Sequence, residues 1–108
     1  MIQQIHPREL AAKRKAGEAV HLLDVRQQWE HETAALPDSQ LIPLDQLMAR
    51  AAEIQPPEGA LLVVYCHHGI RSLSAAAFLQ QEGLANVASL AGGIDAWSQQ
   101  IDPAVPRY

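Results

Sequence analysis

Short apolar runs alternate with longer stretches of helical periodicity along this chain of 108 residues. The clearest apolar run is "ALLVVYC", residues 60–66, which is typical of a strand buried on both faces within a parallel sheet. The clearest helical stretch is "SLSAAAFLQQEG", which is rich in alanine and ends at Gly83. The pattern therefore predicts a central strand, a short loop that begins after Cys66, and a helix behind the loop.

The same alternation extends to both ends of the chain. Apolar runs predict further strands at residues 2–6, 20–25 and 86–90, and a brief one around Leu41 and Ile42. Helical patterns and breaker residues predict helices at residues 7–17, 26–33, 45–55 and 93–101. In the third of these helices the apolar positions recur at helical spacing: Leu44, Leu47, Met48 and Ala51. This order predicts an α/β layer fold around a mostly parallel sheet.

The composition is that of a soluble globular protein, with 48% apolar and 19% charged residues. The length predicts one domain over residues 1–108, because a core of this size buries well over half of the surface of the unfolded chain. The formal net charge is −4 and the basic residues are scattered, so we expect neither a nucleic-acid partner nor a membrane partner. The N-terminus lacks a signal-peptide pattern and no apolar run reaches roughly 18 residues, so we expect a cytoplasmic location.

Cys66 is the single cysteine and stands at the carboxyl end of the predicted central strand, the edge at which α/β folds bind ligands. Gly69 allows a tight turn there. The loop amides and the start of the following helix would together stabilise a thiolate. Arg71 is a nearby cation, and residues 59–81 contain no aspartate or glutamate. We therefore expect a locally positive loop that binds a small anionic substrate.

Two other roles for Cys66 stand beside that of a nucleophile. A lone cysteine after an apolar run is often a small core residue, but such a thiol needs no polar, cationic loop around it. Zinc binding by Cys66, His67 and His68 is disfavoured because the three are consecutive, whereas structural zinc sites usually separate paired ligands by a few residues. We expect a free, nucleophilic thiol and no metal site.

Three segments of the chain carry a resemblance to a known family. The loop "CHHGIRS" resembles the active-site loop of the rhodanese-like sulfurtransferases. That loop begins with cysteine, two variable residues, glycine and one more variable residue. Arginine and then serine or threonine often follow. Upstream, "LLDVRQQWEHE" is similar to the family's "hxDVRxxxEY" segment. Downstream, "LAGGIDAW" is similar to its "LxGGhxAW" segment. The three segments occur in family order and span nearly the whole chain.

The resemblance is closest to single-domain rhodaneses and to rhodanese domains attached to ubiquitin-activating-like adenylyltransferases, which commonly end in a segment similar to "DPAVPRY". One segment departs from the family pattern. Where the family usually has "GHIPGAxNIP", this chain has "AALPDSQLIP", without the glycines and the histidine, at Ala34, Ala35 and Asp38. We expect this change to affect the backbone of residues 34–40 rather than the chemistry.

The resemblance implies a three-layer α/β/α fold around a five-stranded parallel sheet, and a catalytic Cys66 that carries a persulfide. The implied sulfur donor is thiosulfate or a persulfide, the implied acceptor is a thiol, a sulfur-accepting protein or cyanide, and no cofactor is expected. Asp24 and Arg26 are expected to support the neighbouring strand end, with Asp24 holding Arg26 or a loop amide. The loop residues implied to bind the substrate are His67, His68, Gly69, Ile70, Arg71 and Ser72.

Further residues near these motifs have expected roles. We expect Arg71 to bind the donor anion, and Ser72 to cap the following helix rather than to bond the sulfur. Glu30 is expected to be a surface or loop-bracing carboxylate. Trp29 and Trp97 are expected to be packing residues.

Two competing functions remain on the sequence alone. The related cysteine phosphatases have loops that resemble "CxxxxxR", with five residues between nucleophile and arginine, whereas four residues separate Cys66 from Arg71 here. A loop with four residues between the cysteine and the arginine suits a single sulfur atom better than a tetrahedral phosphoryl group. The second competitor is a non-catalytic module that docks a partner protein or senses an anion, but such modules often lack the cysteine.

Overall fold

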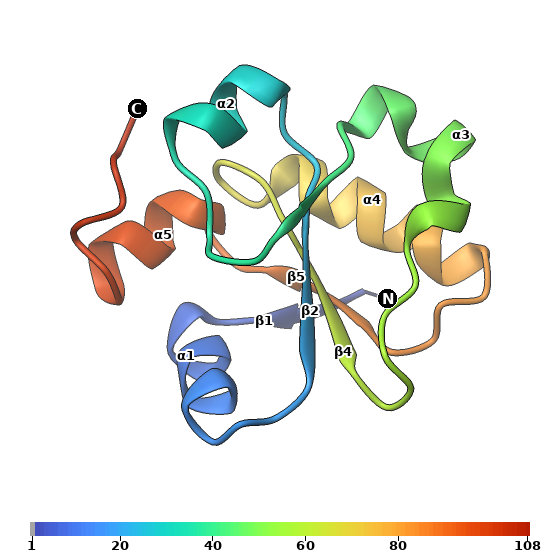
Figure 1. Cartoon of the computed structure of the whole chain (residues 1–108), viewed down its shortest axis with the longest axis horizontal. Helices are drawn as coiled ribbons and strands as arrows, with labels where there is room; N and C mark the ends of the chain where they lie inside the picture. Colours follow the sequence, from blue (N-terminus) through green and yellow to red (C-terminus); the bar gives the residue numbers. More distant parts are fainter. Residues whose placement is uncertain (1) are drawn as a thin grey trace.

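The apolar run at residues 60–66 forms β4 (Leu61–Tyr65), the middle strand of a five-stranded parallel sheet. The computed structural model of the protein describes residues 2–108. The strand order is β1-β5-β4-β2-β3 (Figure 1), with β1 at Gln3–Ile5, β2 at Val20–Asp24, β3 at Gln40–Leu41 and β5 at Val87–Leu90. Helices cover both faces of this sheet, which confirms the predicted three-layer α/β/α fold.

Helices connect the strands in the order that the alternation predicts. They are α1 (Pro7–Lys15), α2 (Gln28–Thr33), α3 (Leu47–Arg50), α4 (Ile70–Gln81) and α5 (Gly93–Gln100). Short 3-10 turns flank α3 at Leu44–Gln46 and Ala51–Glu53. Within residues 2–108, none of these helices combines the length and the apolar character that a membrane span requires.

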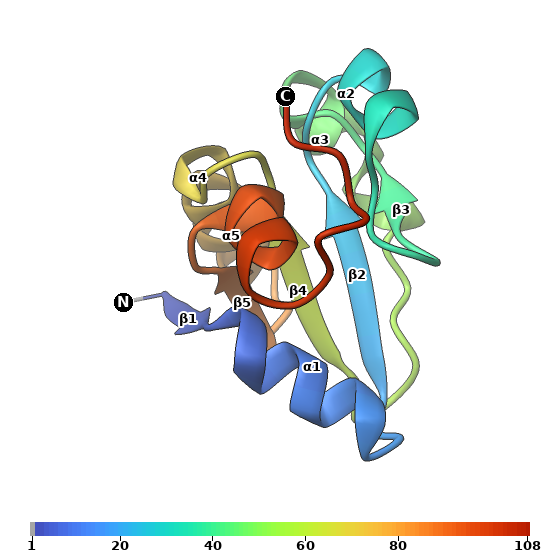
Figure 2. The ribbon, with the colours of Figure 1, turned by 90° about the vertical axis from the view of Figure 1, so that its left-hand side faces the viewer.

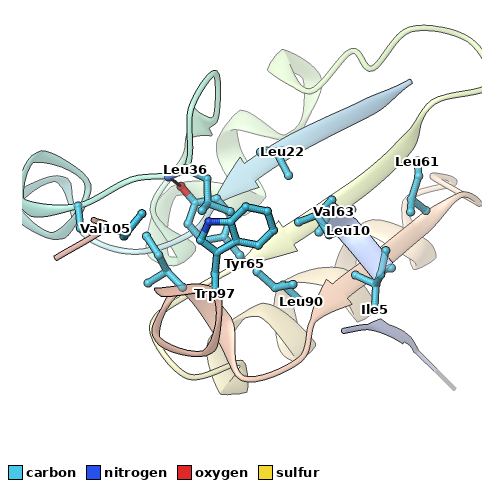
Figure 3. Close-up of a cluster of buried hydrophobic side chains, with 13 residues drawn as sticks. Ile5, Leu10, Leu22, Leu36, Leu61, Val63, Tyr65, Leu90, Trp97 and Val105 are labelled. Carbon is cyan, nitrogen blue, oxygen red and sulfur yellow. Dashed lines mark hydrogen bonds between the residues drawn. The ribbon is translucent and has the colours of Figure 1, made fainter. Parts of the chain in front are cut away.

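Alternate side chains of β4 supply the two halves of the core. Leu61, Val63 and Tyr65 face the side covered by α1 and α5, where they pack with Trp97 and Leu90 (Figure 3). The intervening side chains of β4 face the opposite side and pack with residues of α3 and α4. Because side chains alternate along a strand, a fully apolar run such as this one must be buried on both faces.

The helical segment predicted at residues 45–55 is present but not continuous, because the chain there forms a 3-10 turn, one turn of α-helix and a second 3-10 turn. The Leu44 amide donates to the carbonyl of Val25, which ties the start of the segment to the end of β2. Leu47 and Ile54 are buried in the core, Leu44 and Ala51 pack against it while partly buried, and Met48 is 80% exposed. The helical spacing of the apolar residues therefore predicted more buried side chains than this segment of short helical turns contains.

The carboxyl ends of the parallel strands place several loops at one end of the sheet. Figure 1 shows α2 and the loop between β4 and α4 at this end, and residue 108 finishes beside α2. Figure 2 shows the same arrangement after a quarter turn, with the last residues running upward past α5 to α2. The helix α2 and the end of the chain are thereby brought to the end of the sheet at which the loop after β4 lies.

The atypical segment at residues 34–40 is anchored by Tyr65. The Leu36 amide donates to the Tyr65 hydroxyl at 3.2 Å, and the Ser39 hydroxyl lies 2.8 Å from the same oxygen. Asp38 adopts a left-handed conformation with φ of 62°, at the position where the family pattern has glycine. Aspartate tolerates this region better than most side chains, so the turn is kept without the glycine.

Substitution of Asp38 tests this account of the turn. Asp38→Val should lower the free energy of unfolding by about 1–2 kcal/mol, because a β-branched side chain is poorly tolerated in a left-handed conformation. Asp38→Gly should leave it unchanged or raise it by up to about 1 kcal/mol. Urea denaturation of the two variants and the parent protein measures both effects, and equal stability of all three would contradict the left-handed turn.

Candidate active site

Cys66 directly follows β4 and is only 1% exposed. Its Sγ accepts a hydrogen bond from the Gly69 amide at 3.1 Å and another from the Ser72 amide at 3.3 Å. Two backbone donors from a loop of a few residues thus converge on one sulfur atom. Amide donors stabilise an anion more than a neutral thiol, so the surroundings of Sγ favour a negatively charged sulfur.

The loop turns at Gly69, which precedes the first residue of α4 and has φ of 98°. This left-handed conformation is accessible to glycine at little cost. It directs the chain into α4, a helix of 12 residues whose N-terminus adjoins the sulfur. The first amides of an α-helix have no intrahelical acceptor and carry partial positive charge, so this helix start adds to the anion-binding character of the loop.

The start of α5 fixes the opposite side of the loop. The Ile94 amide donates to the Cys66 carbonyl at 2.8 Å, and the Asp95 amide donates to the His67 carbonyl at 3.1 Å. These contacts hold the loop carbonyls against α5, while the Gly69 and Ser72 amides bond the sulfur. A Cβ at Gly93 would lie 2.4 Å from both carbonyl oxygens, so only glycine allows the helix to approach this closely.

The positive charge predicted for the loop is partly balanced, because Glu30 pairs with Arg71. The two guanidinium nitrogens of Arg71 donate to the two carboxylate oxygens of Glu30 at 2.8 and 2.9 Å. The hydrogen bonds from Arg71 lower the pKa of Glu30 to about 2, against the effect of its burial. The partner lies 41 residues away in the sequence, in α2, and so escapes any local count of charges.

The ion pairs at this edge are nevertheless asymmetric in their exposure. The side chain of Arg71 is 34% exposed and that of Glu30 only 5%. Arg107 pairs with Asp95 at 2.8 Å, and their side chains are 59% and 12% exposed. In both pairs the carboxylate lies beneath the cation, so the surface that a ligand meets is the guanidinium side.

Tyr108, the last residue of the chain, joins several of these groups. Its hydroxyl donates to Glu30 at 2.8 Å and accepts from Arg26 at 2.7 Å, and its ring stacks on His67 with centroids 4.0 Å apart. Burial raises the pKa of Tyr108 to about 12, so the hydroxyl keeps its proton at neutral pH. No local pattern predicts a role for Tyr108, and its one signal in the sequence is the similarity of the segment "DPAVPRY" to the ends of related chains.

Asp24 and Arg26 form a fully buried ion pair at the end of β2. Asp24 accepts from the side chain of Arg26 at 2.8 and 2.7 Å and from its backbone amide at 3.0 Å. His31 lies 2.8 Å from the same carboxylate. The expectation that Asp24 holds Arg26 is therefore met, and Arg26 in turn holds Tyr108 above the loop.

The two histidines of the loop have different surroundings. His67 lies between Tyr108 and His68, and its Nε2 is buried without a hydrogen-bond partner among residues 2–108. Burial and the neighbouring His68 lower the pKa of His67, so this imidazole is neutral at pH 7. His68 projects outward, with its side chain 60% exposed and its Nε2 3.7 Å from Asp95.

His67, His68 and Asp95 each offer a ligand atom within 4.8 Å of the others, which makes them the metal-ligating group to consider among residues 2–108. The Asp95 carboxylate already accepts hydrogen bonds from Arg107 and Gln99. A metal ion would therefore compete with a guanidinium for this carboxylate. Nothing in the surroundings of the Cys66 sulfur depends on such an ion.

The prediction that Ser72 caps α4 is wrong, because Gly69 occupies the cap and Ser72 is the third residue of the helix. The Ser72 hydroxyl lies 3.5 Å from the Cys66 Sγ and 2.7 Å from the hydroxyl of Ser89 in β5. Ser72 and Ser89 are both fully buried. Ser89 is not among the predicted site residues, although a serine inside the apolar run "NVASL" is a signal.

The two tryptophans differ in their burial. Trp97 is 7% exposed and packs in the core, as expected (Figure 3). Trp29 is 60% exposed and meets the edge of the Tyr108 ring, with centroids 5.8 Å apart, so its predicted role in packing does not extend to the core. Glu30 next to it is buried and braces the loop through Arg71, which fits the loop-bracing alternative.

Two hollows of about 410 and 280 Å³ lie on the surface, but neither is lined by residues of the Cys66 loop. The larger hollow lies near the amino ends of the strands, at the other end of the sheet from Cys66, and residues such as Gln3, Lys13 and Leu61 line it. Neither hollow contains a cysteine or a histidine. The candidate site is therefore identified by the chemistry around Cys66 and not by the size of a cavity.

Several known proteins are similar to this chain in sequence. The family model described as "Rhodanese-like domain" matches residues 6–100 of the chain. A sulfurtransferase of Allochromatium vinosum is 34% identical over 105 residues, covering 97% of this chain and 96% of that protein. The probable adenylyltransferase/sulfurtransferase MoeZ of Mycobacterium tuberculosis is 33% identical over 104 residues, covering 96% of this chain but only 26% of that protein.

A similarity of structure accompanies the similarity of sequence. The crystal structure of a rhodanese-related protein from Thermoplasma volcanium superimposes with a TM-score of 0.81 and 30% sequence identity. The match covers 92% of this chain and 93% of that protein.

Replacement of Gly93 tests the close contact between α5 and the loop. Gly93→Ala should lower the free energy of unfolding by about 3 kcal/mol or more, because the new methyl group collides with two carbonyl oxygens and the residue must also keep a positive φ. Urea denaturation measures the loss. Gly59→Ala is the matched control, since Gly59 also has a positive φ but would have no atom within 4 Å of its Cβ. Its cost should be limited to about 1–2 kcal/mol, and equal losses in the two variants would contradict the proposed collision.

The pairing of Glu30 with Arg71 predicts a pH dependence of stability. Because the pKa of Glu30 falls from 4.5 to about 2 on folding, its contribution is complete above pH 4.5 and is lost as the pH falls towards 2. Urea denaturation between pH 5 and pH 2 should show a loss of stability that is smaller in Glu30→Gln, by on the order of 2 kcal/mol.

Glu53 provides the control for this measurement, because it forms a similar but exposed pair with Arg50. Glu53→Gln should leave the acid-induced loss nearly unchanged, since exposed ion pairs contribute little. A Glu30→Gln variant with the full acid sensitivity of the parent protein would show that the buried pair does not stabilise the fold.

Proposed function

The chain belongs to the rhodanese-like family, and on this premise we propose that it is a sulfurtransferase in which Cys66 carries sulfur as a persulfide. The observation that supports this most directly is the set of donors around the Cys66 Sγ, which accepts hydrogen bonds from two backbone amides at the start of a helix. A nucleophilic thiolate and a bound persulfide both need such donors.

The proposed reaction has two displacements. The Cys66 thiolate attacks the outer sulfur of thiosulfate, the sulfur–sulfur bond of the donor breaks, and sulfite leaves with the bonding electrons. The enzyme then holds a cysteine persulfide with a negative terminal sulfur. A thiolate acceptor or cyanide attacks this terminal sulfur and the Cys66 thiolate is released. A persulfide donor would load the enzyme by the same displacement, with a thiolate as the leaving group.

The loop at residues 67–72 supplies the proposed binding site for the terminal sulfur. Ile70 and Arg71 provide first-turn amides of α4, and such amides have no intrahelical acceptor. We assign substrate binding to the six loop residues and catalysis to Cys66, with Asp24 and Arg26 as supporting residues. Asp24 and Arg26 act through Tyr108, which they hold against His67.

The exposed guanidinium groups support an anionic donor in spite of the two ion pairs. Arg71 and Arg107 face solvent while their carboxylate partners are largely covered, so an approaching anion meets the cations first. A donor that binds Arg71 directly must compete with Glu30 for the guanidinium. This geometry favours thiosulfate or a persulfide as the donor over a neutral molecule.

The length of the loop between Cys66 and Arg71 favours sulfur transfer over phosphate hydrolysis. Four residues separate Cys66 from Arg71, and Cys66 is nearly inaccessible at 1% exposure. A single sulfur atom needs less room above the nucleophile than a phosphoryl group with its oxygens. The presence of the cysteine, bonded by loop amides, also argues against a module that only binds a partner.

The acceptor in the cell belongs to the same proposal. Relatives such as MoeZ combine adenylyltransferase and sulfurtransferase in one name, and this chain spans about a quarter of that protein. We propose a thiol acceptor or a sulfur-accepting protein, reached in the cytoplasm.

Mass spectrometry after incubation with thiosulfate tests the proposed function. The intact protein should gain one sulfur atom, because the persulfide is a covalent intermediate of the ping-pong reaction. Cyanide should then remove the sulfur and release thiocyanate in equal amount.

Cys66→Ser is the control, and it should gain no sulfur under the same conditions. Failure of the parent protein to gain sulfur from either thiosulfate or a low-molecular-weight persulfide would refute the assignment, as would an unchanged adduct on Cys66→Ser. Hydrolysis of an aryl phosphate without any sulfur adduct would favour the phosphatase alternative.

A further inference from the structure

Three buried groups from different elements form a row that ends at the reactive sulfur. Ser89 lies in β5, Ser72 lies in the first turn of α4, and Cys66 follows β4. The Ser89 and Ser72 hydroxyl oxygens are 2.7 Å apart, and the Ser72 oxygen is 3.5 Å from the Cys66 Sγ. Ser72 and Ser89 have no exposed surface and Cys66 only 1%, so bulk water cannot replace a missing partner.

The number of available acceptors determines the direction of these hydrogen bonds. Within residues 2–108, the hydroxyl of Ser89 has one hydrogen-bond partner, the oxygen of Ser72. A buried hydroxyl hydrogen without an acceptor is costly, so Ser89 donates to Ser72. While Cys66 carries its hydrogen, the thiol donates to the Ser72 oxygen. Once that hydrogen is lost, the Ser72 hydroxyl has the sulfur as its remaining partner, and both hydroxyl hydrogens then point towards the sulfur.

A thiol at Cys66 would be poorly matched to this row. Its hydrogen is donated to the Ser72 oxygen, and one of the two serine hydroxyl hydrogens is then left without an acceptor. A thiolate carries no hydrogen and accepts from Ser72 as it does from the two loop amides. The inner sulfur of a persulfide also carries no hydrogen, so the loaded form of the enzyme would fit the same donors.

We propose that Ser89 is a positioning residue that fixes the Ser72 hydroxyl as a donor to the Cys66 sulfur and thereby increases the reactivity of the thiol. The proposal rests on the proposed function only for its use in sulfur transfer, because the reactivity of the thiol can be measured without any sulfur donor. Donation by Ser89 also polarises the Ser72 hydroxyl and makes it a stronger donor.

Alkylation of Cys66 by iodoacetamide tests the proposal on the full chain. At pH 7, Ser89→Ala should react about two- to fivefold more slowly than the parent protein, because the Ser72 hydroxyl loses its fixed direction. Ser72→Ala should react about tenfold more slowly. The double variant should match Ser72→Ala alone, since Ser89 acts through Ser72.

The charged and titratable groups near the sulfur stay unchanged in these variants. They are His67 and His68 of the loop, Arg71 of α4, Glu30 of α2, Asp95 of α5, and Arg107 and Tyr108 at the end of the chain. Ser39→Ala is the matched control, because it removes a hydroxyl bonded to Tyr65 and to the Leu36 carbonyl, away from Cys66. It should not change the alkylation rate, and thermal unfolding should show that all variants are folded.

Two outcomes would overturn the role of Ser89. One is an alkylation rate in Ser89→Ala equal to that of the parent protein. The other is that Ser89→Ala slows alkylation by the same factor in the parent protein and in the Ser72→Ala background. Either result could occur while thiosulfate still adds sulfur to Cys66, so it would leave the proposed sulfurtransferase function intact. Conversely, a slower alkylation in Ser89→Ala would support the role of Ser89 even if no sulfur donor reacted.

Discussion

Two hydrogen bonds from the start of α5 to the carbonyls of Cys66 and His67 determine the shape of the loop on which the candidate chemistry depends. They hold the loop carbonyls against α5 and leave the Gly69 and Ser72 amides to bond the sulfur. The contact is so close that Gly93 admits no Cβ. This explains why the segment "LAGGIDAW", nearly thirty residues from the cysteine in sequence, belongs to the same functional unit.

A second network supports the loop from the side of α2. Asp24 holds Arg26, Arg26 and Glu30 hold the Tyr108 hydroxyl, and Glu30 holds Arg71. Buried charges are costly unless each is paired and hydrogen bonded, and here every carboxylate of the network has a guanidinium partner. The arrangement keeps the negative charges away from the outer surface. It also couples the end of the chain to His67, so the loop, α2 and the last residue form one rigid edge of the site.

The fold and the position of Cys66 at the end of the central strand could be predicted from the sequence because both depend on local patterns. The unbroken apolar run before Cys66 required a central strand, and the glycine after it required a turn. The partners of the loop residues depended instead on tertiary structure. Glu30 reaches Arg71 across 41 residues and Glu30 reaches Tyr108 across 78, and neither contact has a local signature. Ser72 was assigned to the helix cap because serine favours that position, but Gly69 already supplies the turn there.

The central claim is that the loop holds a sulfur atom transferred to Cys66, and a crystal structure of the protein after exposure to thiosulfate tests it most directly. The account predicts one additional atom bonded to the Cys66 Sγ, within hydrogen-bonding distance of the amides at the start of α4, while the Gly69 and Ser72 amides remain on Sγ. A sulfur adduct that points away from these amides, or thiosulfate bound with an unmodified Cys66 in crystals that show no turnover, would contradict the account.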